Sequence, residues 1–246
     1  MGATEMRKLQ ADKNRPQPER MEAATAKPDV EDIAERITNA VMEHRLPPGI
    51  KLAEERLASA FGVSRTKIRQ ALTVLSREGL VKLHPNRGAF VASPTVKEAL
   101  DLFETRRLVE PEIVRNVIGK AGKADVKRLR AHLAAEADAR ARGDRRTIIK
   151  LSGAFHMLLA EVAGNSFIEK LMAELCPLTC LIISLYDAPQ TPACPEDEHV
   201  QIVNAIERKD EDEAVRLMLR HLDHVRNELR LGESEKQDID WDQMFG

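Results

Sequence analysis

The chain contains few cysteines and few aromatic residues. Its 246 residues include three cysteines, one tryptophan and one tyrosine, and aromatic residues make up only 3% of the total. An odd number of cysteines argues against a disulfide framework. Scarce aromatic residues beside 43% apolar and 32% charged residues are typical of a soluble, mainly helical protein.

Long hydrophobic runs are also missing from the sequence. No apolar stretch approaches the roughly 18–20 residues that a membrane-spanning helix needs. The N-terminus lacks the apolar segment of a signal peptide. We therefore expect a cytoplasmic protein with no membrane partner. With 246 residues, the chain is long enough for two domains.

Charge is distributed unevenly along the chain. The net charge is −2, but residues 1–95 hold 16 basic and 12 acidic residues, whereas residues 96–246 hold 22 basic and 28 acidic residues. A basic front half and an acidic back half predict a DNA-binding domain joined to a domain that does not contact DNA.

The most informative segment is residues 61–72, which read Phe-Gly-Val-Ser-Arg-Thr-Lys-Ile-Arg-Gln-Ala-Leu. Gly62 suits a tight turn, because it tolerates a positive φ, and Ser64 can cap the helix that follows. Arg65 and Arg69 share one face near the start of that helix. This is where a helix-turn-helix protein meets base edges in the major groove, so the segment predicts a DNA-reading helix.

The flanking sequence predicts the rest of a small DNA-binding domain. Apolar spacing predicts helices over 33–44 and 54–61, separated by a Pro-Pro-Gly breaker. Strands over 80–84 and 89–91, joined by a basic tight turn, predict a wing. Arg87 at the tip of the wing is expected to enter a minor groove or to hold a phosphate.

Many of these residues form an ordered set between about 30 and 94. The set comprises Leu46-Pro47-Pro48-Gly49, Leu52-x-Glu54, Leu57-Ala58, Gly62-Val63-Ser64-Arg65-Thr66, Ile68-Arg69-x-Ala71-Leu72, Gly79-Leu80-Val81 and Asn86-x-Gly88-x-Phe90-Val91. It resembles the winged helix-turn-helix domain of the GntR family of bacterial transcription regulators. The resemblance implies DNA contacts from Ser64, Arg65, Thr66, Lys67, Arg69, Arg87 and Gly88.

Three positions depart from the family pattern. Many members carry a proline at the position of Lys67 and a glutamate at the position of Gln70. Many also carry an operator-contacting arginine where this chain has Glu55, although Arg56 is its neighbour. A carboxylate repels phosphate, so DNA contacts from the helix over 54–61 are not expected at Glu55.

The back half, from about 96 to 231, contains four motifs in order. They are Phe103-Glu104-x-Arg106-x-x-x-Glu110, then Phe155-His156-x-x-Leu159 with Ala163-Gly164-Asn165, then Glu198-His199-x-x-Ile202-x-x-Ala205-Ile206, and finally Met218-x-x-His221-Leu222. Behind a winged helix of this kind they resemble the FCD domain, the effector-binding domain of the FadR subgroup of GntR regulators.

The resemblance implies a metal site. In such domains three histidines and one aspartate bind a divalent metal, and the histidines here would be His156, His199 and His221. Neutral imidazoles suit zinc and similar ions, and three ligands leave positions open for water or an effector. Ser152 stands where the family has its aspartate, so another carboxylate, water or the effector would complete the site. His224 shares a face with His221 and is an alternative ligand.

Three residues are candidates for effector binding: Arg106, Ser152 and Asn165. An inward-facing Arg106 can clamp a carboxylate through two hydrogen bonds, or it can form an ion pair between helices. Asn165 can cap the next helix or line the pocket. Cys176 and Cys180 lie one helical turn apart, where they can chelate a metal or serve as small core residues.

The expected fold is mainly α: an N-terminal winged helix-turn-helix with a small β-wing, followed by an all-α helical bundle. We predict a disordered tail over 1–28, the winged domain over 29–94, an effector-binding and dimerisation domain over 95–231 and a polar tail over 232–246. Apolar spacing predicts the bundle helices at about 95–119, 124–142, 144–163, 166–187, 195–208 and 210–231.

The leading hypothesis is a ligand-responsive transcriptional regulator with no enzymatic activity, and the resemblance favours repression. It would bind a palindromic DNA operator as a homodimer, because two recognition helices that read half-sites require two-fold symmetry. The effector would be a small carboxylate-bearing metabolite such as an organic acid. One alternative is a metal-dependent hydrolase fused to a DNA-binding domain. Another keeps the regulator and omits the metal.

Overall fold

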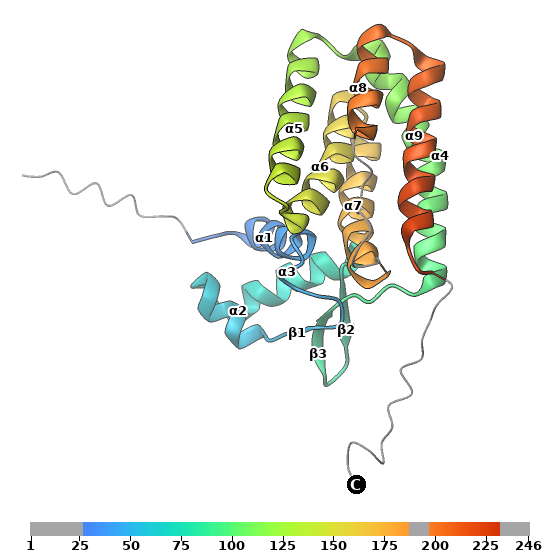
Figure 1. Ribbon diagram of the computed structural model, residues 1–246. Helices are drawn as coiled ribbons and strands as arrows, with labels where there is room; N and C mark the ends of the chain where they lie inside the picture. The colour runs from blue at the N-terminus through green and yellow to red at the C-terminus, as the bar shows by residue number, and fades with distance from the viewer. Residues whose placement is uncertain (1–26, 187–196, 232–246) are drawn as a thin grey trace, which may run out of the picture.

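The computed structural model describes residues 27–186 and 197–231. Most of the N-terminal tail, Cys194 and the C-terminal tail over 232–246 lie outside these residues, so those expectations stay predictions. Within the described residues the chain forms a small mixed domain below an upright group of six helices (Figure 1).

The first domain contains three helices: α1 (Val30–Met42), α2 (Glu54–Phe61) and α3 (Arg65–Arg77). Asp29 precedes α1 and forms a capping box with Asp32. The Asp29 carboxylate accepts from the backbone N–H of Asp32, and the Asp32 carboxylate accepts from the backbone N–H of Asp29. The apolar face of α1 then packs against α3. Ile33 and Ile68 are both fully buried in the core of this domain.

Three short strands complete the domain: β1 (Lys51–Leu52), β2 (Val81–His84) and β3 (Gly88–Val91). They form an antiparallel sheet in the order β1-β3-β2, in which Lys51 lies opposite Phe90 and His84 lies opposite Gly88. The wing formed by β2 and β3 agrees with the sequence prediction. The pairing of β1 with β3 was not predicted.

The second domain is a bundle of antiparallel helices. Its members are α4 (Val96–Lys120), α5 (Lys123–Ala141), α6 (Arg145–Ala163), α7 (Ser166–Tyr186), α8 (Glu198–Arg208) and α9 (Glu211–Glu228). Helix α4 packs along α9 and α6, while α5 packs along α6 and α8 (Figure 1). The predicted fold class, a winged helix-turn-helix followed by a helical bundle, is confirmed. No helix within the described residues is long and apolar enough to cross a bilayer.

The predicted end of the last helix was wrong by three residues. Helix α9 ends at Glu228, because Leu229 adopts an extended conformation with φ −82° and ψ 133°. The backbone N–H of Arg230 then donates to the carbonyl of Tyr186 at 2.9 Å. This bond ties the end of α9 to the end of α7.

The two domains pack closely against each other. Leu181 of α7 belongs to the core of the winged domain, and Met42 at the end of α1 belongs to a core cluster of the bundle. The Lys150 ammonium on α6 donates to Glu43 at 2.6 Å, just after α1. The winged domain is therefore held directly against α6 and α7.

Candidate metal centre and DNA-reading helix

The turn between α2 and α3 has the geometry that its sequence requires. Gly62 ends α2 in the left-handed conformation, with φ 66° and ψ 32°. Ser64 begins α3 from an extended conformation, and its hydroxyl accepts from the backbone N–H of Lys67 at 3.3 Å. The start of α3 is thereby fixed at the surface, where its first side chains face solvent.

The predicted DNA-binding side chains of α3 do not all point the same way. Arg65 and Arg69 are exposed, with 54% and 62% of their side chains accessible. Thr66 is exposed between them. Lys67 instead is half-buried, and its ammonium donates to the carbonyl of Pro28 at 3.0 Å. Arg65 and Arg69 thus form the cationic face of α3.

The wing presents a second cation at its tip. Arg87 in the turn from β2 to β3 and Gly88 at the start of β3 are both exposed, and Gly88 has φ +96°. The guanidinium of Arg87 lies 5.8 Å from the centre of the Phe90 ring. The wing tip therefore offers a positive charge beside an aromatic ring.

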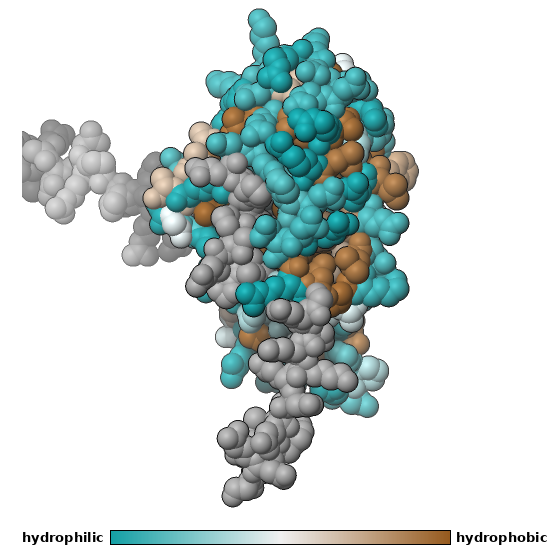
Figure 2. Space-filling view, turned by 45° about the vertical axis from the view of Figure 1, so that its right-hand side comes forward, coloured by the Kyte–Doolittle hydropathy of each residue, from teal (hydrophilic) through white to brown (hydrophobic). Residues whose placement is uncertain are grey.

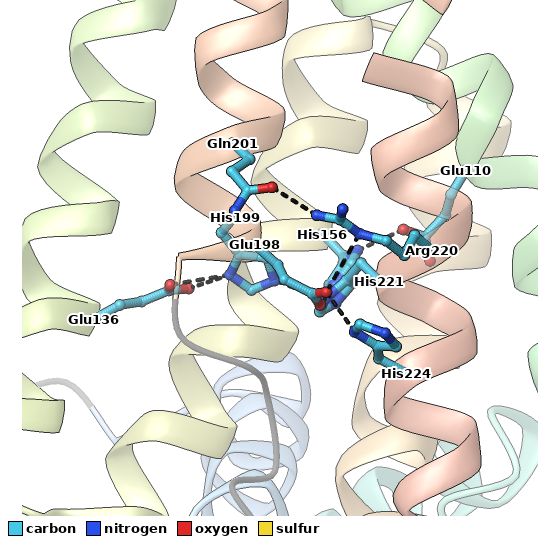
Figure 3. Close-up of polar contacts among 9 residues, drawn as sticks. All are labelled: Glu110, Glu136, His156, Glu198, His199, Gln201, Arg220, His221 and His224. Carbon is cyan, nitrogen blue, oxygen red and sulfur yellow. Dashed lines mark hydrogen bonds and ion pairs between the residues drawn. The ribbon is translucent and has the colours of Figure 1, made fainter. Parts of the chain in front are cut away.

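Three buried histidines meet inside the bundle. They are His156 of α6, His199 of α8 and His221 of α9, each no more than 2% exposed (Figure 3). The Nε2 atom of His221 lies 3.2 Å from that of His156 and 3.3 Å from that of His199. Three imidazoles bound to one zinc ion at about 2.0–2.1 Å would place their nitrogens roughly 3.0–3.4 Å apart. The measured spacing fits a shared metal ion.

A glutamate lies behind each of these three rings, from α4, α5 and α8 respectively. The His156 Nδ1 lies 2.5 Å from Glu110, and the His199 Nδ1 lies 2.9 Å from Glu136. The third contact joins the Nδ1 of His221 to Glu198 at 2.9 Å (Figure 3).

These carboxylates fix the state of the rings. An ionised carboxylate only accepts hydrogen bonds, so each Nδ1 carries the proton and each Nε2 presents a lone pair. Three lone pairs that converge at this spacing repel one another unless a cation lies between them. The donor set therefore suits a divalent transition metal.

The local pKa values favour the same protonation state. Burial raises the pKa of Glu110, but the charge of Arg106 and the hydrogen bonds from His156 and Arg106 outweigh burial and hold that pKa at about 2. Burial lowers the pKa of His156 to about 3, despite the nearby Glu110 carboxylate. At neutral pH the glutamate is charged and the imidazole is neutral, which is the form that binds a metal.

A cleft of about 410 Å³ lies between α5 and α8 and reaches this cluster. Glu136 and His199 line the cleft together with Leu133, Arg140 and Val200. The cleft joins an apolar wall to charged groups, as is common in small-molecule sites.

Two family models match the chain. The model described as bacterial regulatory proteins of the gntR family matches residues 29–91, and the FCD domain model matches residues 101–224, about half of the chain. The chain belongs to the GntR family and carries an FCD domain. It is therefore a transcriptional regulator of a DNA-binding family, and the resemblance noted from its sequence is confirmed.

Relatives of this GntR regulator cover most of its length. It is 29% identical to the HTH-type transcriptional regulator YdhC of Bacillus subtilis strain 168, over 72% of this chain and 80% of that protein. It is 24% identical to the HTH-type transcriptional repressor RspR of Escherichia coli K12, over 80% of this chain and 86% of that protein. A crystal structure of a GntR regulator from Rhodococcus sp. RHA1 has the same fold, with a TM-score of 0.71, 24% identity and coverage of 83% of this chain and 98% of that one.

Two other predicted site residues of the GntR regulator differ in burial: Ser152 is buried, and Asn165 is exposed. Ser152 is 9% exposed on α6, one turn before His156. Asn165 is exposed at the start of α7, where its side-chain oxygen accepts from the backbone N–H groups of Phe167 and Ile168 at 3.1 and 3.4 Å. Asn165 therefore caps α7, away from the buried cluster.

Arg106 contacts the same Glu110 carboxylate as His156. Its Nε donates to Glu110 at 2.5 Å and its Nη1 donates to Thr179 at 3.2 Å, while Nη2 has no hydrogen-bond partner within the described structure. The nearby thiols of Cys176 and Cys180 are buried, and burial raises the pKa of both, that of Cys180 to about 12. Protonated thiols fit the core-residue interpretation of these cysteines.

Sequence reasoning did not assign the three glutamates to the histidines. Glu110 was noted only as part of a motif. Glu198 was noted only as the neighbour of His199 in its motif, whereas its carboxylate contacts His221 and His224 on α9. For Glu136 the signal was its position on the apolar face of α5.

Proposed function

We propose that this GntR regulator is a ligand-responsive repressor that binds a palindromic operator as a homodimer in the cytoplasm. The observation that carries the proposal is the pairing of two sites in one chain. A winged helix exposes Arg65 and Arg69, and the bundle that packs against it contains three convergent histidines. The first site suits DNA, and the second suits a metal with an anionic small molecule.

The DNA side of the proposal rests on α3 and the wing. Arg65 and Arg69 can reach base edges in a major groove, while Arg87 and Gly88 at the wing tip can approach the backbone or the minor groove. Ser64 and Thr66 lie at the start of α3, where hydroxyls and free amides suit phosphate. Lys67 can join these contacts only if it leaves Pro28.

The effector side of the proposal rests on the histidine cluster. His156, His199 and His221 would hold a divalent transition metal, most simply zinc, and the metal would supply a positive charge for a carboxylate. The adjoining cleft of about 410 Å³ has room for a small organic acid. Ser152 precedes His156 by one turn of α6 and would border the cluster, and Arg106 has one unpaired nitrogen for an effector carboxylate.

The positions of the glutamates favour a regulator over a hydrolase. Glu110, Glu136 and Glu198 all contact the Nδ1 side of the rings, opposite the converging Nε2 atoms. They orient ligands and do not stand where a general base would meet a bound water.

The surface of α4 supports assembly of two copies. Figure 2 shows a largely hydrophilic face interrupted by separate hydrophobic areas. On α4, Leu100 and Leu108 are 45% and 76% exposed, and they lie two helical turns apart. Exposed leucines on one side of a helix are suited to cover by a second chain. Light scattering should give twice the chain mass of 27.6 kDa.

Operator binding is tested by fluorescence anisotropy with DNA from upstream of the gene. Arg65→Ala and Arg69→Ala are each expected to weaken specific binding by about 1–3 kcal/mol without unfolding the protein. Arg77→Ala, at the other end of α3, is the matched control and should bind as wild type. No preference over bulk DNA at moderate salt would contradict the proposal.

Metal binding is tested separately, by elemental analysis of purified protein. Wild type should retain a transition metal and His199→Ala should lose it, whereas His224→Ala should retain it because His224 is half-exposed and outside the cluster. Equal metal content in wild type and His199→Ala would contradict metal binding by the histidine cluster. It would not bear on the proposed DNA binding.

A further inference from the structure

Two glutamates of α2 pair with the two exposed arginines of α3. The Nη1 of Arg65 donates to Glu55 at 2.9 Å, and the Nε of Arg69 donates to Glu54 at 2.8 Å. A second nitrogen of Arg65 lies 3.7 Å from Glu54. Both cations of the α3 face are therefore paired with carboxylates of the preceding helix.

The two glutamates are placed differently. Glu54 is 25% exposed and contacts both arginines, so it sets the spacing between them. Glu55 is 76% exposed and contacts only Arg65. A pair this exposed is weak and exchanges readily with other anions. Another anion can therefore displace the Glu55 carboxylate from Arg65.

We propose that Glu55 is a specificity-determining residue, which competes with DNA phosphate for Arg65. This inference rests on the proposed DNA-binding function. A phosphate must displace the Glu55 carboxylate and is also repelled by it. A guanine edge carries no net charge and offers two acceptors to one guanidinium. Glu55 thus weakens non-specific binding more than it weakens recognition of a guanine.

The pairing of Arg65 with Glu55 also affects how much Arg65 contributes to the salt dependence of binding. While paired, Arg65 contributes little to counterion release on an arbitrary duplex, because its charge is already neutralised. On the operator it leaves Glu55 and pairs with a base. The proposal therefore predicts that Glu55 affects both the strength and the salt dependence of non-specific binding.

The first test is Glu55→Gln, which removes the charge and keeps the shape. By fluorescence anisotropy on a mixed-sequence duplex, the variant should bind about threefold more tightly than wild type, the scale of one exposed ion pair. Its salt dependence should be steeper by about one counterion per chain. Unchanged affinity and unchanged salt slope would overturn the proposal.

Asp212→Asn is the matched control for net charge. Asp212 is exposed in the first turn of α9, at the end of the bundle farthest from the winged domain (Figure 1). This variant should bind the mixed-sequence duplex as wild type does. An equal gain in Asp212→Asn and Glu55→Gln would mean that only overall charge matters, and would overturn the assignment to Glu55.

A double-mutant cycle identifies Arg65 as the partner. In an Arg65→Ala background, Glu55→Gln should lose most of its gain, because the carboxylate no longer has the cation for which it competes. An undiminished gain in that background would overturn the proposal. If wild type binds no duplex even at low salt, the DNA-binding function itself fails, and that outcome is distinct from both results above.

Discussion

Ser152 is the residue at which this chain departs most from the metal site that its family resemblance implies. It precedes His156 by one turn of α6 and is 9% exposed. A serine hydroxyl is a poor metal ligand, whereas a carboxylate adds charge and a strong oxygen donor. Ser152→Asp should therefore tighten zinc binding by roughly tenfold or more.

The comparison that isolates this effect is Ser152→Ala. Since the hydroxyl is not expected to bind the metal, the alanine variant should match wild type in competition with a chromogenic chelator. If Ser152→Asp also matches wild type, Ser152 does not border the metal, and the proposed position of the site is wrong.

Of the three carboxylate–histidine contacts, the one between Glu136 and His199 joins the residues farthest apart in sequence. The Glu136 oxygen lies 2.9 Å from the Nδ1 of His199, and the same group lies 3.3 Å from the Nε2 of His132. Burial raises the pKa of Glu136, but hydrogen bonds from His132 and His199 outweigh burial and leave it well below its usual value. Glu136→Gln replaces a charged acceptor by a weaker neutral one, so zinc affinity should fall by about 10–100-fold.

A surface carboxylate joins the same two helices and serves as the control. Glu207 of α8 pairs with Arg130 of α5, and the pair is more than one-third exposed. Glu207→Gln should leave zinc affinity unchanged. Equal losses in the two variants would mean that general loosening of α5 from α8, and not the His199 contact, lowers affinity.

At the scale of helices and strands, the sequence predicted those boundaries that nearby capping and turn residues specify. Ser64 and Gly62 fix both sides of the turn before α3, and Gly164 ends α6 in the left-handed conformation, so these boundaries could be read directly. Strand β1 could not, because two residues carry no periodicity. Its pairing is visible only once Lys51 lies opposite Phe90.

The histidine cluster shows the same division between local and long-range information. His156, His199 and His221 could be named from motifs, since each stands at a recognisable place in its own helix. The glutamates behind them could not be assigned, because Glu136 and His199 are 63 residues apart and meet only through the packing of α5 against α8. Sequence spacing does not specify which helices become neighbours.

Helices α1, α6 and α7 approach one another closely at Gly153. A Cβ added there would lie 2.9 Å from the Cys180 sulfur and 3.1 Å from the end of Met42. The methionine can move, but the short cysteine side chain cannot move far. Gly153→Ala should therefore lower the free energy of unfolding by about 1–3 kcal/mol, as measured by urea denaturation.

Two further variants make this prediction specific. Adding Cys180→Ala should restore most of the loss, because it removes the obstructing sulfur. Gly119→Ala in α4, where a Cβ would meet nothing within 4 Å, should be neutral or stabilising by up to about 1 kcal/mol. A neutral Gly153→Ala would show that the junction has more free space than its distances indicate.

At the scale of the whole molecule, the two domains share their apolar cores. Leu181 of α7 is 1% exposed within the winged-domain core, and Met42 is 4% exposed within a cluster of the bundle. The hydroxyl of Tyr186 at the end of α7 also donates to the carbonyl of Pro94, between β3 and α4, at 2.8 Å. Unfolding of one domain would expose the core of the other, so the chain should unfold as one cooperative unit.

Shared cores predict that a metal bound by the histidine cluster would also stabilise α3 of the winged domain. A ligand that binds only the folded state at a hundred times its Kd adds about 2.7 kcal/mol to the free energy of unfolding. Backbone amides of α3 that exchange through global unfolding should then exchange about 100-fold more slowly with zinc than with a chelator. His221→Ala should show no such difference in either domain. Slower exchange confined to α4–α9 in the wild type would mean that the winged domain opens independently, and that contacts at Met42 and Leu181 do not couple the histidine cluster to α3.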